Sequence, residues 1–324
     1  MITVIIVSYN TVELLRKCLW ELFAQTITTE LEVFVVDNNS ADDSVQMVQE
    51  EFPQVKLIVN RDNRGFAAAN NQAWHRSSGE YILLLNPDAY VRSQAVDFCL
   101  DFMATHPQCG LCGGRLIKED GTLDPSARKF PNFINKLFTL SGLMDRFPHS
   151  ALFAGHEFGN FNHKTVMEVD WVPGTFCLCR RSMLQETGFF DERFYIYFEE
   201  TDLCRTAKKK GWKVYFYPDA EVVHVGGACS KTRKNFNFDS SAKQILTFRM
   251  QSEWLYYYKN HGLLAVLASA GVEISWHLLR LMVNLLPGRV DALAKRTSSL
   301  AVIRAVLHTL KATKAGMLAP PTPW

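Results

Sequence analysis

The sequence predicts an α/β protein with a mostly parallel sheet flanked by helices, and three observations support this prediction. Four apolar runs of strand length alternate with segments of helical periodicity over residues 2–85. The run at 81–85 is uninterrupted, as is typical of a strand that is buried on both faces. The composition, with 48% hydrophobic and 21% charged residues in 324, is that of a globular protein with an ample core.

The first half of the chain alternates regularly between strands and helices. We expect strands at 2–7, 31–36, 55–59 and 81–85, with helices at 11–25, 43–51 and 64–76 between them. Such β-α-β units place parallel strands side by side. Pro87 cannot continue a central ladder, so the fourth strand should end before it. Polar clusters at 8–10, 37–40 and 86–88 follow three of these strands, and the topology would gather them at one edge of the sheet.

The second half is less regular. The pattern indicates helices at 96–106, 181–187, 199–210 and 235–260, and strands at 109–117, 169–180, 213–217 and 220–224, the second with an internal turn at Pro173 and Gly174. Residues 118–165 are rich in loops. We therefore expect a sheet domain over 1–235, a helical extension over 236–318 and a disordered tail over 319–324.

Charge and cysteine content exclude several classes of protein. The net charge of +2 gives no electrostatic reason to expect nucleic acid as a partner. The eight cysteines are scattered and lack the spacing of a zinc ribbon, which favours free buried thiols in a reducing compartment. The chain opens directly with a strand and shows no signal peptide, so we expect it to be cytoplasmic.

One short segment carries three carboxylates in four residues. Glu199, Glu200 and Asp202 stand at a predicted helix start, directly after the aromatic run 194–198. Acidic residues are common there because the helix dipole favours negative charge. The alternative is a general base that deprotonates a hydroxyl, with the aromatic run as an apolar wall that raises a carboxyl pKa or binds a sugar face.

An acid and a histidine elsewhere in the chain suit a metal ion. Asp88 follows the fourth strand, and His224 ends the apolar run that begins at Val222. Mg²⁺ and Mn²⁺ take oxygen ligands, and Mn²⁺ also accepts an imidazole. A single histidine is more often structural, and Asn-Pro-Asp at 86–88 is also ordinary turn chemistry. The position of both residues at strand ends favours metal ligation.

Seven stretches in a fixed order resemble one enzyme family. They are VIIVSYN (4–10), VVDNNSADDS (35–44), NRGFAAANNQA (63–73), LLLNPDAY (83–90), WVPGTFCLCRR (171–181), GFFDERFYIYFEETDLCRTAKKKGW (188–212) and the strand end at His224. The chain resembles family 2 glycosyltransferases, the inverting enzymes with a GT-A fold, and above all their bacterial rhamnosyltransferase-like members. The resemblance covers roughly residues 2–230.

The resemblance implies a site for a nucleotide-sugar donor. Asp37 would hydrogen-bond the pyrimidine base, and the loop at 63–65 would cover the base and the diphosphate. The residues expected to contact the donor are Ser8, Asn10, Asp37, Asn63, Arg64, Gly65, Asn86 and Gly174. Asn86 departs from the family pattern, because it replaces the first acid of the DxD metal motif and removes one charge.

The resemblance also implies the metal ligands and the base. Asp88 matches the last acid of the metal motif, and His224 matches the second protein ligand of a Mg²⁺ or Mn²⁺ ion. Glu200 matches the catalytic base, which is usually aspartate in the family. Glu199 and Asp202 flank it. The choice between the two glutamates stays open, and the alternative role of Asp202 is to orient Arg205 or an acceptor hydroxyl.

These features predict a transferase that builds a cell-surface polysaccharide. The first choice of donor is dTDP-rhamnose, on the resemblance alone, and the acceptor is a glycan or a lipid-linked glycan. Two alternatives remain open at this level: a family 2 enzyme that uses a UDP-hexose or GDP-mannose, and a catalytically inactive protein that binds a glycan. A homo-oligomer is compatible with either.

The segment 263–286 is an apolar helix with one polar stripe. Its polar residues are Glu273, His277, Arg280 and Asn284, and the basic residues that follow are Lys295, Arg296, Arg304, Lys311 and Lys314. This pattern favours an amphipathic helix in the membrane interface, which would make the enzyme peripheral at the inner face of the cytoplasmic membrane. The alternatives are packing on the catalytic domain or on a second subunit, and, with least weight, a true span.

Overall fold

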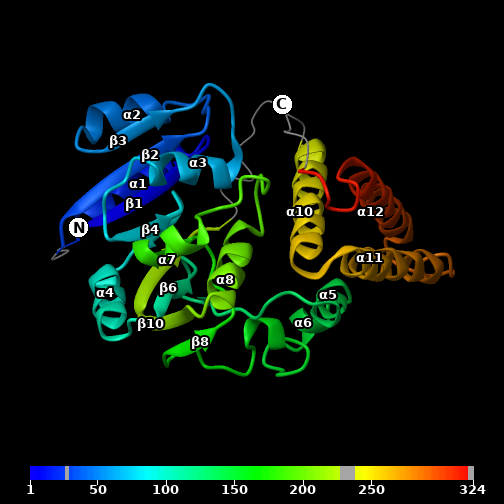
Figure 1. Cartoon of the computed structure of the whole chain (residues 1–324). Coiled ribbons are helices and arrows are strands. Elements are labelled where there is room, and N and C mark those ends of the chain that lie inside the picture. Colours follow the sequence, from blue (N-terminus) through cyan, green and yellow to red (C-terminus); the bar gives the residue numbers. More distant parts are fainter. Residues whose placement is uncertain (26–28, 227–237, 320–324) are drawn as a thin grey trace.

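The computed structural model describes residues 1–25, 29–226 and 238–319 (Figure 1). The strands are β1 (Ile2–Ser8), β2 (Leu31–Asp37), β3 (Lys56–Val59), β4 (Tyr81–Leu85), β5 (Ala89–Val91), β6 (Cys109–Ile117), β7 (Leu123–Asp124), β8 (Met167–Val169), β9 (Phe176–Arg180) and β10 (Lys213–His224). The helices are α1 (Val12–Phe23), α2 (Ser44–Glu51), α3 (Gly65–Trp74), α4 (Ala95–Thr105), α5 (Phe133–Leu140), α6 (Leu143–Arg146), the 3-10 helix η1 (Gly155–Glu157), α7 (Arg181–Thr187), α8 (Glu199–Lys209), α10 (Phe238–His261), α11 (Leu263–Val283) and α12 (Ala292–Ala312). The predicted boundary at 235–236 and residues 320–324 of the predicted tail lie outside the described residues.

The described strands form one mixed sheet in the order β3-β2-β1-β4-β9-β6-β10-β5, with β7 paired to β6 and β8 paired to β10. The strands β3, β2, β1 and β4 are mutually parallel, and so are β6 and β10, whereas β9 runs antiparallel to both β4 and β6. The prediction of a mostly parallel sheet is therefore confirmed. Because β1, β2 and β4 point the same way, their carboxyl ends and the polar residues that follow them meet at one edge.

Helices cover both faces of the sheet. Apolar residues of α1, α2 and α4 pack on one face, and those of α3, α7 and α8 pack on the other. The four strands of the first half are almost completely buried, apart from the edge strand β3. This double cover explains why β1, β2 and β4 read as mostly apolar runs rather than as alternating ones.

The second half differs from the prediction in a few elements. β10 is a single strand rather than two, and its register shifts between Tyr217 and Glu221, where Pro218 stands. A bulge accommodates proline because no ladder hydrogen bond is required there. The strands β5, β7 and β8 are only two or three residues long, and no sequence pattern predicts them.

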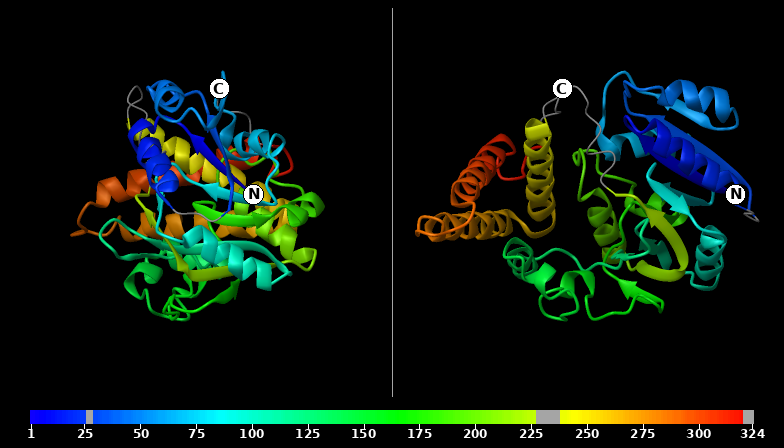
Figure 2. Two further views of the ribbon diagram at one scale, coloured as in Figure 1. Left: turned by 90° about the vertical axis from the view of Figure 1, so that its left-hand side faces the viewer. Right: turned by 180° about the vertical axis from the view of Figure 1, so that it is seen from behind.

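The last three helices form a unit of their own beside the sheet domain (Figures 1 and 2). Their buried apolar side chains make a third core, to which Phe194 of the sheet domain also belongs. The polar stripe of α11 faces inward: Glu273 and His277 are buried. Glu273 pairs with Lys136 of α5 at 2.6 Å and with Arg249 of α10 at 3.3 Å. The polar stripe of α11 therefore packs on the rest of this chain, which is one of the alternatives given for the segment 263–286.

Candidate active site

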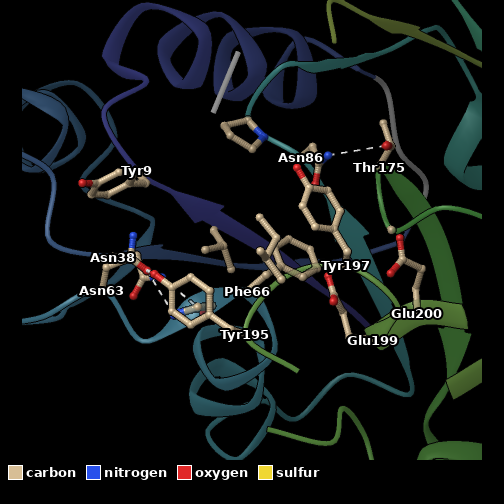
Figure 3. A pocket seen from close by; sticks show the side chains of 15 residues that line it. Tyr9, Asn38, Asn63, Phe66, Asn86, Thr175, Tyr195, Tyr197, Glu199 and Glu200 are labelled. Atoms are coloured by element: carbon tan, nitrogen blue, oxygen red, sulfur yellow. Dashed lines mark hydrogen bonds between the residues drawn. The ribbon is translucent and has the colours of Figure 1, made fainter. Parts of the chain in front are cut away.

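A cavity of about 230 Å³ lies at the carboxyl ends of β1, β2 and β4 (Figure 3). Asn38, Asn63 and Tyr195 form one end of it, and Asn86 and Thr175 form the other. Of the residues predicted from the sequence, six line this cavity: Asn63, Gly65, Asn86, Gly174, Glu199 and Glu200. Tyr195, Ile196 and Tyr197 supply the apolar wall expected beside the two glutamates, and its two tyrosines make it an aromatic wall.

Asn38 organises the end of the cavity that lies near α3. Its side-chain amide donates to Asn63 Oδ1 at 2.8 Å and to the Gly65 carbonyl at 3.2 Å. Its Oδ1 accepts from the backbone N–H of Arg64 at 3.0 Å. The Tyr195 hydroxyl donates to Asn63 Oδ1 at 2.9 Å, so the loop before α3 is tied to the aromatic wall as well. These bonds fix the loop that the resemblance places over the donor.

Gly65 is the one position in this loop that a side chain cannot occupy. Its φ is +81°, and a Cβ there would lie 2.7 Å from Cδ2 of Tyr195 and closer still to the Tyr195 carbonyl oxygen. That oxygen accepts a hydrogen bond from the N–H of Phe66 at 2.7 Å. The glycine therefore lets α3 begin directly against the aromatic wall.

Four other predicted donor residues lie behind the cavity or at its rim rather than in its lining. Ser8 is fully buried and bonds Thr11 at 2.9 Å. Asn10 Oδ1 accepts from the N–H of Ala41 at 2.7 Å, which joins the loops after β1 and β2. The Arg64 side chain is half exposed, with Asp62 at 3.7 Å. These three contacts are within the protein and hold the loops in place.

Asp37 is the fourth of these residues and the most suggestive. Its Oδ2 accepts from the N–H of Ser40 at 3.0 Å, whereas no described residue bonds its buried Oδ1. Burial raises the pKa of the Asp37 carboxyl, and the hydrogen bonds from Ser40 only partly oppose that rise. An unpartnered buried carboxylate oxygen is costly unless a ligand donates to it.

Glu199 and Glu200 enter the cavity from the first turn of α8. The two residues before them, Tyr197 and Phe198, have φ of +72° and +68°, a rare conformation for large side chains that tends to mark functional sites. No described residue bonds Oε2 of either glutamate. Burial raises the pKa of both carboxyls, and the charge of Glu200 raises that of Glu199 further. The backbone of Gly174 hydrogen-bonds Glu200 and limits its rise.

Asp202 does not join the two glutamates in the cavity. It is buried, and its Oδ2 accepts from Lys259 at 2.7 Å while its Oδ1 accepts from Asn260 at 2.9 Å. Both oxygens are thus used to fasten α8 to α10. The geometry gives Asp202 a structural contact, and the expectation that it orients Arg205 or an acceptor hydroxyl receives no support.

Asp88 and His224 lie together beside the cavity, next to Asn86 and Pro87 in its lining. The Nε2 atom of His224 is 3.7 Å from Asp88 Oδ1, which is buried and receives no hydrogen bond from a described residue. The Nδ1 atom of His224 lies 2.8 Å from Asp124 Oδ2. Burial lowers the pKa of His224, but the Asp124 hydrogen bond and the Asp88 charge outweigh it and raise the pKa overall.

This pair fits a divalent cation. A carboxylate oxygen without a partner faces an imidazole whose other nitrogen is held by a second carboxylate, and that is the outer-shell arrangement usual for metal-ligating histidines. Among the described residues no three His, Cys, Asp or Glu side chains gather as a complete cage. Mg²⁺ and Mn²⁺ sites of this kind are completed by phosphate oxygens and water.

Sequence reasoning missed several residues of the site. Asn38 and Tyr9 stood inside polar clusters that were singled out, so their position at a strand end was a usable signal. Asp124 carried no such signal, because β7 is two residues long and lies in a stretch rich in loops. Only the pairing of β7 with β6 brings Asp124 to His224, 100 residues along the chain.

Comparison with known proteins gives a consistent result. Residues 3–162 match the family model of glycosyl transferase family 2. The chain is 28% identical over 236 residues to the N-acetylglucosaminyl-diphospho-decaprenol L-rhamnosyltransferase of Mycobacterium tuberculosis, covering 68% of this chain and 75% of that protein. It is 23% identical over 254 residues to a low-salt glycan biosynthesis hexosyltransferase of Haloferax volcanii, covering 76% and 73%.

Solved structures share the fold. A mannosyltransferase from Pyrobaculum calidifontis, in complex with GDP-Man and Mn²⁺, has a TM-score of 0.54 at 16% identity and covers 95% of this chain and 86% of its own. Residues 1–349 of TarS from S. aureus give a TM-score of 0.50 at 15% identity, with 97% and 91% covered. Residues 3–162 therefore form a glycosyl transferase family 2 domain, and the chain is a glycosyltransferase with the GT-A fold.

Proposed function

We propose that this glycosyltransferase transfers L-rhamnose from dTDP-rhamnose, with inversion, to a hydroxyl of a lipid-linked glycan at the inner face of the cytoplasmic membrane. The observation that carries the proposal is that one cavity has the Glu199–Glu200 pair in its wall and the Asp88–His224 pair beside it. The similarity to the rhamnosyltransferase from Mycobacterium tuberculosis supports rhamnose as the sugar, and the decaprenyl-diphosphate-linked acceptor of that enzyme supports a lipid-linked acceptor here.

Glu200 is the base in this proposal. In this proposal Glu199, the more deeply buried of the two, carries the proton, because burial and the charge of Glu200 both raise its pKa. Glu200 stays ionised and accepts the proton of the acceptor hydroxyl. The hydroxyl oxygen then bonds to the anomeric carbon, and the nucleoside diphosphate leaves with the electron pair of the broken bond.

The remaining residues position the donor. Asp88 and His224 would hold a Mg²⁺ or Mn²⁺ ion, which supplies positive charge to neutralise the diphosphate. Asp37 Oδ1 would accept from the N–H of the pyrimidine base, and Tyr195 would lie along the donor. Asn86 would contact the donor without adding charge.

Calorimetric titration with dTDP, UDP, GDP and CMP, with Mn²⁺ and with EDTA, tests the donor and the metal together. We expect dTDP to bind in Mn²⁺, and Asp88→Ala to lose that binding. Asp219→Ala is the matched control, because Asp219 is an exposed acid on the same strand as His224. Preference for UDP or GDP would refute rhamnose from dTDP-rhamnose, and equal binding in EDTA would refute the metal site.

A further inference from the structure

The helices α11 and α12 form a hairpin that projects from the protein on the side away from β1–β3 (Figures 1 and 2). The inner face of α11 carries charge. Lys136 of α5 lies 2.7 Å from Glu253 of α10 and 2.6 Å from Glu273 of α11, and it bonds Ser269 at 3.0 Å. All of these groups are buried or nearly so. The side of α11 that packs on the enzyme therefore holds all of its buried charge, beside the apolar Val266 and Ala270.

The outer face of α11 is apolar. Leu264 and Met282 lie half a turn away from Glu273 around the helix, and they are 81% and 59% exposed. Further exposed apolar residues lie on the same helix and in the turn after it: Leu267, Leu278, Leu279, Val283, Leu285, Leu286 and Val290. Each of them keeps more than a third of its surface exposed in the described structure. A helix at a protein surface normally has the opposite arrangement, with its polar side outward.

The exposed face of α12 combines leucine with basic residues. Leu300 and Leu307 are exposed, and Arg304 and Lys311 each follow one of them by four residues, which places them on the same side of the helix. The segment 263–318 holds seven basic residues: Arg280, Arg289, Lys295, Arg296, Arg304, Lys311 and Lys314. Its two acids are Glu273, which is already paired, and Asp291.

We infer that the outer face of the α11–α12 hairpin docks on the surface of an anionic lipid bilayer. Apolar side chains would enter the interface while Arg304 and Lys311 meet lipid phosphates, the arrangement of a peripheral amphipathic hairpin. Charge favours this occupant over a second copy of the chain, because two copies would bring the same basic residues face to face.

A true membrane span would expose the polar stripe to lipid. By length and composition, α11 is the one described helix that is apolar enough to cross a membrane, with a mean hydropathy of 1.3 over a stretch of 18 residues. To span, however, it would have to separate Glu273 from Lys136 and Arg249, and leave a carboxylate in hydrocarbon. Docking by the outer face keeps every one of these ion pairs.

The link between this surface and a lipid-linked acceptor rests on the proposed function, whereas lipid binding itself does not. Cosedimentation of the full chain with vesicles tests the latter without any substrate. We expect binding to vesicles that contain phosphatidylglycerol, little binding to phosphatidylcholine alone, and a decrease as salt is added.

Two double variants separate the apolar and the electrostatic contributions. Leu264→Gln with Met282→Gln should weaken vesicle binding by about tenfold or more, because two inserted side chains become polar. Arg304→Gln with Lys311→Gln should lower binding to anionic vesicles by a similar factor, since each cation near the surface contributes several-fold. Leu152→Gln, which changes a leucine that is 63% exposed outside the hairpin, is the control and should bind as the wild type does.

Three results would overturn the inference. They are a wild type that does not sediment with anionic vesicles, double variants that bind as well as the wild type, and a concentration-dependent dimer that Leu264→Gln with Met282→Gln dissolves. The last result would assign the face to a second copy. Far-UV circular dichroism confirms that each variant is folded. Nucleotide titration of the same variants without lipid reports on the donor site separately, so failure of the proposed donor chemistry cannot be mistaken for failure of membrane docking.

Discussion

Replacing Gly65 by alanine tests how the loop before α3 meets the aromatic wall. The substitution places a Cβ 2.7 Å from Cδ2 of Tyr195 at a φ of +81°. The left-handed backbone costs about 1–2 kcal/mol for a residue with a Cβ. Displacing Tyr195 also breaks the hydrogen bond that its carbonyl accepts from Phe66, which is worth about 1 kcal/mol. We expect a loss of about 2–3 kcal/mol in the free energy of unfolding.

Gly121 provides a matched control for this experiment. Its φ is also +81°, but a Cβ there would have nothing within 4 Å. Gly121→Ala should therefore lower the free energy of unfolding by the backbone cost alone, about 1–2 kcal/mol, and should leave nucleotide binding unchanged. The difference between the two variants isolates the contact with Tyr195.

Urea denaturation and calorimetric nucleotide titration measure the two effects. Gly65→Ala should be less stable than Gly121→Ala by about 1 kcal/mol or more, because only the first variant loses the hydrogen bond. Its affinity for the nucleotide should fall at least tenfold, because Tyr195 would move in the cavity wall. Equal stability and equal affinity in the two variants would refute the argument that the Gly65–Tyr195 contact shapes the site.

Three further predictions concern other carboxylates. Asp124→Asn should weaken Mn²⁺ binding by about 10–100-fold, as measured by titration, because His224 loses the carboxylate that orients it. Glu199→Gln should keep most of the activity, since glutamine mimics the protonated acid, whereas Glu200→Gln should lower kcat by about 10²-fold or more. Burial raises the pKa of Glu32, but hydrogen bonds from Lys56, Thr3 and Ser78 outweigh burial and lower this pKa to about 2. The ionised Glu32 should therefore stabilise the fold by about 2 kcal/mol at neutral pH, and Glu32→Gln should remove this contribution.

The pH dependence fixes the sign of the last two predictions. The folded pKa of Glu32 lies below its ordinary value of 4.5, so its contribution is present above pH 4.5 and is lost as pH falls toward 2. Denaturation curves of wild type and Glu32→Gln should therefore converge in acid, and a constant difference would contradict the argument.

The raised pKa of Glu200 requires activity to rise with pH above the range in which an ordinary glutamate titrates. An inactive Glu199→Gln beside an active Glu200→Gln would reverse the assignment of the base.

The strands of the first half could be predicted well because burial on both faces requires a mostly apolar run of residues. Runs such as Tyr81–Leu85 are apolar throughout, and Pro87 shows where the strand must stop. The short strands β5, β7 and β8 lack such an apolar run, since their pairing depends on the neighbours β6 and β10 rather than on their own residues. Topology could thus be predicted where the pattern is local.

The same distinction applies to the site. Asn86, Glu199 and Glu200 could be placed at element ends from local pattern alone, and all three line the cavity. Asp202 looked equivalent to its neighbours, yet its oxygens are taken by α10 through a contact that spans 57 residues of sequence. A side chain's neighbours across such distances are set by the packing of whole elements, which a single sequence does not reveal.

The loop that delivers the two glutamates depends on a helix that follows much later in the chain. Ser252 of α10 donates to the carbonyl of Ile196 at 2.8 Å, and Phe198 packs on Tyr256 at 5.3 Å between ring centroids. During synthesis on a ribosome, the sheet and α8 emerge before these partners exist. The Glu199–Glu200 pair therefore gains its support only after α10 has left the exit tunnel, and a chain released before that point has the polar edge of the sheet but no braced loop for the two glutamates.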